Sequence, residues 1–177
     1  KVERRKFRMD TPDFSKENIV NAKLSANPNL KGIGGWLLLL IFFLGLYIPV
    51  TGAWSLYREF ILVPQKMPIL ESNPLWVQYR LMVWIVFGVL CALCFAAGYA
   101  LWRVKRPMTV QLAIGVLWLS GPFVPVIYAA IASAIFNMDF SQALKPFWIG
   151  IFSTSVQSAI WTGYLVKSVR VKNTYYP

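Results

Sequence analysis

Residues 32–57 contain no charged side chain, and this apolar run limits the possible folds more than any other part of the sequence. About 20 consecutive apolar residues, with a helical rise of about 1.5 Å each, cross the hydrocarbon core of a bilayer. Three more uncharged runs follow, at residues 81–102, 107–138 and 146–166, and each is long enough to do the same. The sequence therefore predicts an all-α integral membrane protein, folded as a four-helix bundle.

The chain is 57% hydrophobic and 14% charged, whereas about a quarter of the residues in an ordinary soluble domain are charged. We expect one transmembrane domain over residues 32–167, with basic tails at 1–31 and 168–177. Its spans are predicted at residues 33–54, 81–102, 110–134 and 147–166. Between the first two spans, the segment from Arg58 to Arg80 is predicted to be a loop, and loops as long as this one are usually functional or partly structured.

The positive charges predict the orientation of the chain in the membrane. Of its 18 Lys and Arg residues, 14 fall in residues 1–31, 103–106 and 167–177, and four fall in the other two connections. Because cation-rich segments remain in the cytoplasm, we expect both termini to be cytoplasmic. The same placement, at the ends of apolar runs, argues against a nucleic acid partner.

Two motifs resemble those of a known family. The chain has KGIGGWL at residues 31–37 before the first span and SVRVKNTY at 168–175 after the last. Together with four spans, these motifs are similar to the domain-of-unknown-function 2569 family of small bacterial inner-membrane proteins, over about residues 30–176. The resemblance implies a four-helix fold in the inner membrane with both ends inside, and it implies no catalytic residues. Members of the family tend to have Phe where Tyr175 stands.

Glycines and prolines mark two backbone irregularities. Gly32, Gly34 and Gly35 predict a tight entry into the first span, or alternatively amides that hold a lipid phosphate together with Lys31. A phosphate-binding loop is excluded, because such a loop needs Lys-Ser or Lys-Thr after the glycines. In the third span, Pro122 and Pro125 predict a bent or locally unwound helix.

Two helix faces are candidate packing interfaces. Small residues recur every four positions in the second span, which would let another helix approach closely. Polar residues gather in the fourth span, where they predict hydrogen bonds between helices or, alternatively, a polar track for a small solute. The interface residues are Gly88, Ala92, Ala96, Ala100, Thr154, Gln157, Ser158 and Thr162.

Basic residues at the predicted cytoplasmic face are candidates for contact with anionic lipid headgroups or with an acidic partner. They are Lys31, Arg103, Lys105, Arg106, Arg170 and Lys172.

The sequence contains few groups that could carry out a reaction. It has no His, and its only two cysteines, Cys91 and Cys94, lie within the second predicted span. A tetrahedral metal site or an iron–sulfur cluster needs more ligands than this pair, so packing is the favoured role and a cluster shared with a partner is the alternative. We therefore expect no catalytic, cofactor-binding or metal-binding residues, and no enzymatic activity.

These features favour an accessory or scaffold subunit of a larger membrane complex, associated with a membrane protein or with copies of itself. The alternative is a small transporter or lipid-handling protein, with a cavity lined by the third and fourth spans.

Overall fold

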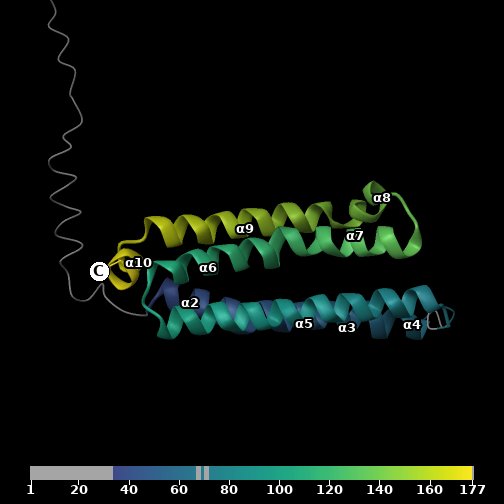
Figure 1. Ribbon diagram of the computed structural model, residues 1–177, viewed down its shortest axis with the longest axis horizontal. Coiled ribbons are helices and arrows are strands. Elements are labelled where there is room, and N and C mark those ends of the chain that lie inside the picture. Colours follow the sequence, from purple (N-terminus) through teal and green to yellow (C-terminus); the bar gives the residue numbers. More distant parts are fainter. Residues whose placement is uncertain (1–33, 67–68, 70–71, 177) are drawn as a thin grey trace, which may run out of the picture.

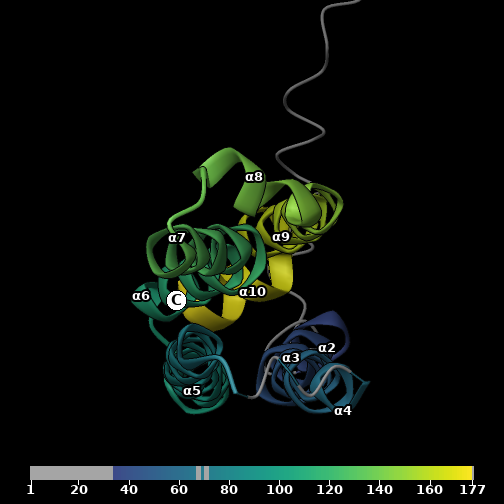
Figure 2. The same ribbon diagram turned by 90° about the vertical axis from the view of Figure 1, so that its right-hand side faces the viewer.

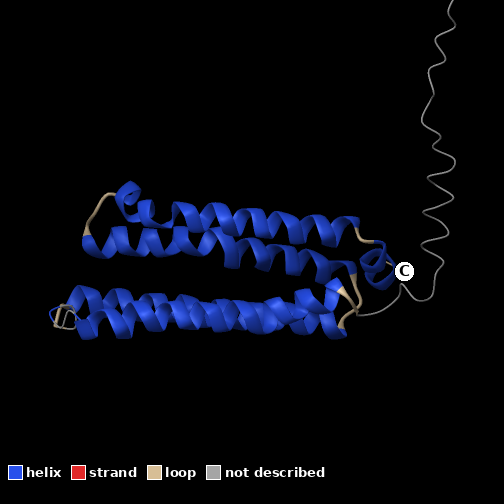
Figure 3. Ribbon diagram, turned by 180° about the vertical axis from the view of Figure 1, so that it is seen from behind, coloured by secondary structure: helices blue, strands red, loops and turns tan. Residues whose placement is uncertain are grey.

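The computed structural model describes residues 34–66, 69 and 72–176, and this part of the chain contains helices and connections without a strand (Figures 1 and 3). The N-terminal tail, with Lys31 and Gly32, lies outside the described residues. Four helical rods run side by side along the molecule. The first rod consists of α2 (Trp36–Phe42), η2 (Phe43–Tyr47), α3 (Ile48–Tyr57), η3 (Arg58–Leu62) and α4 (Val63–Lys66). The second rod is the single helix α5 (Pro74–Arg103). The third rod consists of α6 (Pro107–Trp118), η5 (Leu119–Phe123) and α7 (Val124–Phe136), and the fourth is α9 (Trp148–Lys167). Short helices α8 (Phe140–Leu144) and η6 (Lys145–Phe147) precede the fourth rod, and α10 (Val169–Tyr175) follows it.

Local sequence signals set the helix ends. Asn73 caps α5, because its side-chain oxygen accepts a hydrogen bond of 2.9 Å from the N–H of Leu75. Pro74 then occupies the first helical position, where its missing N–H leaves no bond unmade. At the end of α7, Asn137 adopts a left-handed conformation with φ of 50°, and Asp139 caps α8. These signals fix where α5 and α8 begin and where α7 ends.

Helix covers most of the segment between Arg58 and Arg80, for which the sequence predicts a loop. The first rod continues through η3 and α4 to Lys66, and α5 already begins at Pro74. For these residues the predicted loop is wrong. Proline accounts for the error, because Pro74 begins a helix at the one position where proline is favoured.

Three π-helical turns interrupt the described rods, η2 and η3 in the first and η5 in the third. Pro49 follows η2, and Pro122 lies within η5. Proline removes one backbone hydrogen bond and its ring displaces the preceding turn, so a wider turn can form without breaking the rod. The turn at η5 is important for the site described below.

Figure 2 shows the rods end-on, arranged around a common axis. The second rod packs against α2, η2 and α3 on one side and against α6 and α7 on the other, and the fourth rod packs on α6 and η5. The first and fourth rods meet through aromatic rings near α10, where Trp161 lies 5.9 Å from Phe43 and 6.3 Å from Trp36 between ring centroids. The start of the first rod, the turn between the second and third rods, and α10 all lie at the same end (Figure 1).

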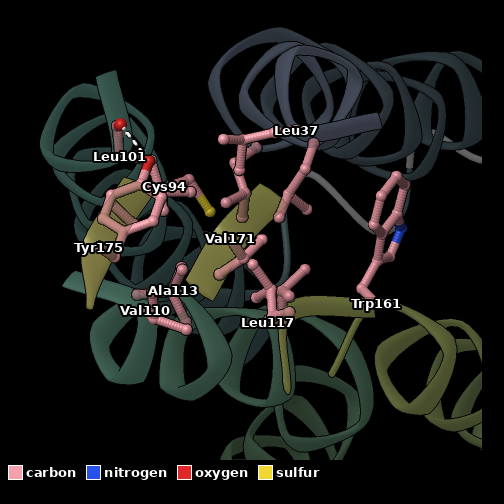
Figure 4. Close-up of a cluster of buried hydrophobic side chains, with 14 of the residues drawn as sticks. Leu37, Cys94, Leu101, Val110, Ala113, Leu117, Trp161, Val171 and Tyr175 are labelled. Carbon is pink, nitrogen blue, oxygen red and sulfur yellow. Dashed lines mark hydrogen bonds between the residues drawn. The ribbon is translucent and has the colours of Figure 1, made fainter. Parts of the chain in front are cut away.

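The buried core lies in two clusters, one toward each end of the bundle. The cluster at the α10 end includes Leu37, Leu101, Val171 and Tyr175, which converge in Figure 4. The cluster at the other end consists of Leu56, Phe60, Tyr79, Val83 and Phe87.

Large apolar side chains cover the outside of the bundle as well as its core. Leu38, Phe42, Phe152 and Ile149 are all exposed, with Ile149 at 86%. An apolar surface of this extent is typical of a protein face that contacts lipid. Three helical segments of the described chain are long and apolar enough to cross a membrane: Trp36–Leu62, Pro74–Arg103 and Pro107–Phe136. The protein is therefore an all-helical, membrane-embedded protein.

Candidate functional site: a cavity between the four rods

A cavity of about 350 Å³ lies between the two core clusters and receives side chains from all four rods. Its apolar walls come mainly from the first three rods, and its polar groups are hydroxyls and one amide. The polar lining residues are Tyr47, Thr51, Ser55, Ser120, Tyr128, Thr154, Gln157 and Ser158. None of the described residues that line the cavity is charged.

The cavity reaches the outer surface between the first and fourth rods. Tyr47, Thr51 and Ser55 follow one another at four-residue spacing along the first rod, and Gln157 belongs to the fourth. All four line the cavity and are also exposed. In a membrane, this opening would face the surrounding lipid.

At the closed side of the cavity, the fourth rod approaches η5 closely at Gly121. A Cβ added to Gly121 would lie 2.8 Å from the Oγ of Ser158 and 3.4 Å from the Cβ of Thr154. Only a residue without a side chain fits this contact. Gly121 therefore sets the distance between the third and fourth rods.

The turn at η5 provides an acceptor for the hydroxyl groups. The carbonyl of Leu117 lies five residues before Pro122, whose nitrogen carries no hydrogen for a π-helical bond. This carbonyl accepts hydrogen bonds from the Oγ of Ser158, at 3.0 Å, and from the Oγ of Ser120, at 3.4 Å. The proline turn and the buried serine of the fourth rod thus complement each other.

The predicted polar face of the fourth rod has two roles, and Ser158 takes part in both. Ser158 and Thr162 join the fourth rod to the third. Ser158 donates to the carbonyl of Leu117, and the hydroxyl of Thr162 accepts a bond of 3.2 Å from the Nε1 of Trp118. Thr154 and Gln157 line the cavity. The hydroxyl of Thr154 bonds back to the carbonyl of Gly150 at 2.8 Å, whereas the Gln157 amide has no hydrogen-bond partner among the described residues.

The small-residue stripe of the second rod lies outside the core. Gly88, Ala92 and Ala96 are exposed and Ala100 is half-buried. A Cβ added to Gly88 would meet no atom within 4 Å. Among the described residues, the stripe therefore makes no close helix contact at Gly88.

The two cysteines occupy different environments. Cys94 is fully buried in the core cluster near α10, where its sulfur points toward the other buried side chains (Figure 4), and Cys91 is half-buried. Both are free thiols. No group of three potential metal ligands occurs among the residues that the structure describes.

The two terminal motifs meet at one end of the bundle. A Cβ added to Gly34 would lie 2.5 Å from a guanidinium nitrogen of Arg170, and Gly35 has a positive φ of 56°. A larger residue would strain the backbone at Gly35, whereas at Gly34 it would displace the end of the Arg170 side chain. Arg170 is half-buried there, whereas the other described residues of the predicted basic set are exposed: Arg103, Lys105, Arg106 and Lys172.

Sequence reasoning missed Thr51, Ser55 and Ser120 as cavity residues. The signal was weak but present, because Thr51 and Ser55 are the only Ser or Thr residues in the first apolar run and lie four positions apart. Ser120 stands two residues before Pro122, which by itself predicts only a backbone irregularity.

A family model described as protein of unknown function (DUF2569) matches residues 30–176. This match confirms the resemblance based on the two terminal motifs. No curated protein and no solved structure is significantly similar to the chain.

Proposed function

We propose a ligand-binding function for this chain, which belongs to the family described as protein of unknown function (DUF2569). In this proposal the protein is non-catalytic, uses no cofactor, and holds the uncharged part of an amphipathic lipid in the cavity between its four rods. This is the lipid-handling alternative predicted from the sequence. It differs in one respect, because the cavity is lined by all four rods rather than by the last two.

The proposal places the protein in a bacterial inner membrane, with four spans and both termini in the cytoplasm. Two features support this placement. The chain segments at the α10 end, together with the N-terminal tail, contain 14 of the 18 Lys and Arg residues. The 20 residues of α9, at a rise of about 1.5 Å each, match a hydrocarbon core about 30 Å thick.

The observation that carries the proposal is the character of the cavity. It has hydrogen-bonding groups, none of its described lining residues is charged, and it would open toward lipid. A charged ligand would be left without a counter-charge, at a high desolvation cost. A ligand with hydroxyl or ester groups can instead bond to the Gln157 amide and to the nearby hydroxyls of Thr51 and Ser55. Its apolar chain would extend through the opening into the bilayer.

A photoactivatable diacylglycerol in phosphatidylcholine vesicles tests this function. We expect it to label peptides from α3 and α9, and Ser55→Trp, which fills the opening, should reduce the labelling severalfold. Gln157→Leu should reduce it less. Ser153→Trp is the matched control, because Ser153 is an exposed residue of α9 that does not line the cavity. Equal labelling of the Ser55→Trp and Ser153→Trp proteins would rule out the cavity as the binding site.

A second candidate is the accessory or scaffold subunit, supported by the exposed stripe at Gly88, Ala92 and Ala96. Small residues at four-residue spacing let two helices in a membrane approach closely. The polar face of α9 supports this candidate less, since Ser158 and Thr162 already bond within the chain.

Light scattering of the protein extracted in mild detergent separates the two candidates. The scaffold function predicts a complex larger than one chain, which Ala92→Leu dissociates because its side chain obstructs the stripe. Val89→Leu, at an exposed neighbouring position outside the stripe, should leave the complex intact. A single chain under all gentle extraction conditions would exclude this candidate.

A further inference from the structure

A second hollow, separate from the central cavity, lies at the α10 end of the bundle on the outside of the third and fourth rods. Its volume is about 540 Å³. The walls are the first two turns of α6 and the last turn of α9, and α10 lies across the end where these helices meet (Figure 1). The lining residues are Val110, Gln111, Ile114, Leu165, Val166, Lys172 and Tyr176.

The hollow combines an apolar floor with a polar rim. Val110, Ile114, Leu165 and Val166 form the floor on two neighbouring rods. The rim consists of one cation, Lys172, with the Gln111 amide and the Tyr176 phenol. An apolar floor below a single cationic rim is the complement of an acyl chain below an anionic headgroup.

The two sides of α10 explain why the cation lies beside the hollow. Val171, Thr174 and Tyr175 lie at three- and four-residue spacing and are buried against the bundle. Lys172 and Tyr176 lie four residues apart on another side of the helix, and both are exposed and line the hollow. The buried side therefore holds α10 in place, with Lys172 at the edge of the hollow.

The charge around the hollow favours an anion. Besides Lys172, the α10 end contains Arg103, Lys105 and Arg106, which are exposed. The acids among the described residues, Glu59 and Asp139, lie in η3 and before α8, at the opposite end of the bundle (Figure 1). A negative headgroup at Lys172 would thus meet cations and no described carboxylate.

We propose that this hollow is a binding site for one anionic phospholipid. The phosphate binds Lys172, with Gln111 and Tyr176 as further hydrogen-bond donors, and one acyl chain lies on the floor between α6 and α9. The site goes beyond the proposed function, since it lies outside the central cavity and recognises the charged headgroup of a lipid rather than its uncharged part.

Native mass spectrometry of the full chain, with phosphatidylglycerol and phosphatidylcholine of the same acyl chains, tests the site. We expect phosphatidylglycerol to bind more tightly than phosphatidylcholine. Lys172→Gln should weaken phosphatidylglycerol binding about fivefold, the equivalent of about 1 kcal/mol for one cation near an anionic headgroup. Lys105→Gln is the matched control, because it removes an exposed cation from the same end without touching the hollow.

Val166→Trp tests the floor, because it fills the hollow from a position that is 56% exposed. We expect it to weaken phosphatidylglycerol binding while Lys172 is still present. If this variant does not fold, Gln111→Trp fills the hollow from the other wall. The comparison of Lys172→Gln with Lys105→Gln tests the proposal without either filling variant, because both substitutions change exposed side chains and should leave the fold intact.

Three results would overturn the site. Equal losses for Lys172→Gln and Lys105→Gln would show general attraction to a basic surface. Equal binding of the two lipids would remove the role of the headgroup charge. A dimer that Val166→Trp dissociates would show that a second copy covers the hollow instead of a lipid.

Discussion

At the scale of single residues, the centre of the bundle depends on the missing side chain at position 121. Gly121 lets α9 approach η5 closely enough for the hydroxyl of Ser158 to reach the carbonyl of Leu117, at 3.0 Å. That carbonyl lies where Pro122 interrupts the backbone bonding of the third rod. A glycine, a proline and a serine from two distant chain segments thus form one contact.

Gly121→Ala should therefore destabilise the bundle. Its methyl group would lie 2.8 Å from the Oγ of Ser158, so the rods must separate or the serine must lose its bond. Overpacking of this kind costs about 1–3 kcal/mol. The expected result is a lower midpoint of thermal unfolding in detergent.

Gly115→Ala is the control for this measurement. Gly115 belongs to α6 of the same rod, and a Cβ there would meet nothing within 4 Å. Replacing an unconstrained helical glycine stabilises a helix by about 0.5–1 kcal/mol. A similar change of midpoint in both variants would contradict the role assigned to Gly121.

The residues of the site also show what the sequence could not predict. Ser158 and Thr162 both bond to the third rod, although the Thr162 hydroxyl also donates to a carbonyl of its own helix. The sequence could not distinguish them from Thr154, whose hydroxyl bonds only within its own helix, because a hydroxyl within a helix can do either. Gln157 lies beside this row of hydroxyls and lines the cavity, since the positions of the rods decide which residues face one another.

At the scale of elements, α10 turns the C-terminal tail into a cap for the bundle. The sequence predicts only a basic tail over residues 168–177, since a helix as short as α10 offers too few residues for a periodic pattern to be recognised. The structure gives this segment a buried side, and the Tyr175 hydroxyl donates a hydrogen bond to the carbonyl of Leu101 near the end of α5 (Figure 4). The last carbonyls of a helix lack partners within it, so α10 satisfies one of them.

Tyr175→Phe should weaken the docking of α10 without abolishing it. The ring continues to fill its buried position, but the carbonyl of Leu101 loses its donor, which costs about 1–2 kcal/mol. We expect faster proteolysis after Lys167, Arg170 and Lys172 by trypsin in detergent. Tyr176→Phe is the control, since Tyr176 is 49% exposed, and an equal effect of both substitutions would contradict the cap.

The same contact predicts a pH dependence. Burial, with a smaller contribution from Tyr164, raises the pKa of Tyr175 to about 12 from its ordinary value of 10.0. Below pH 10 both the docked and the undocked phenol are neutral, so docking does not respond to pH. Between about pH 10 and 12 the undocked phenol loses its proton while the docked one keeps it, and docking weakens. The midpoint of thermal unfolding, measured over this pH range, should fall more steeply for the wild type than for Tyr175→Phe.

At the scale of the whole molecule, the sequence predicted the rods more securely than their membrane placement. In the structure, the first three apolar runs form helical segments that are long and apolar enough to span a bilayer. The fourth became the 20-residue helix α9, in which polar residues that serve the contact with the third rod and the cavity lower the hydropathy. In the proposed four-span arrangement, composition alone understates α9, because its polar side chains are partly satisfied inside the bundle.

The placement of α9 decides the topology of the chain, and introduced thiols can measure it. Four spans put Lys105 and Lys172 on the cytoplasmic side and Met138 outside, whereas three spans would separate Lys105 from Lys172. In a Cys91→Ala/Cys94→Ala background, a membrane-impermeant maleimide added to intact spheroplasts should label Met138→Cys. It should label Lys105→Cys and Lys172→Cys only after the membrane is opened. Labelling of Lys172→Cys in intact spheroplasts would place α9 outside the bilayer core, and the central cavity would then no longer open toward lipid.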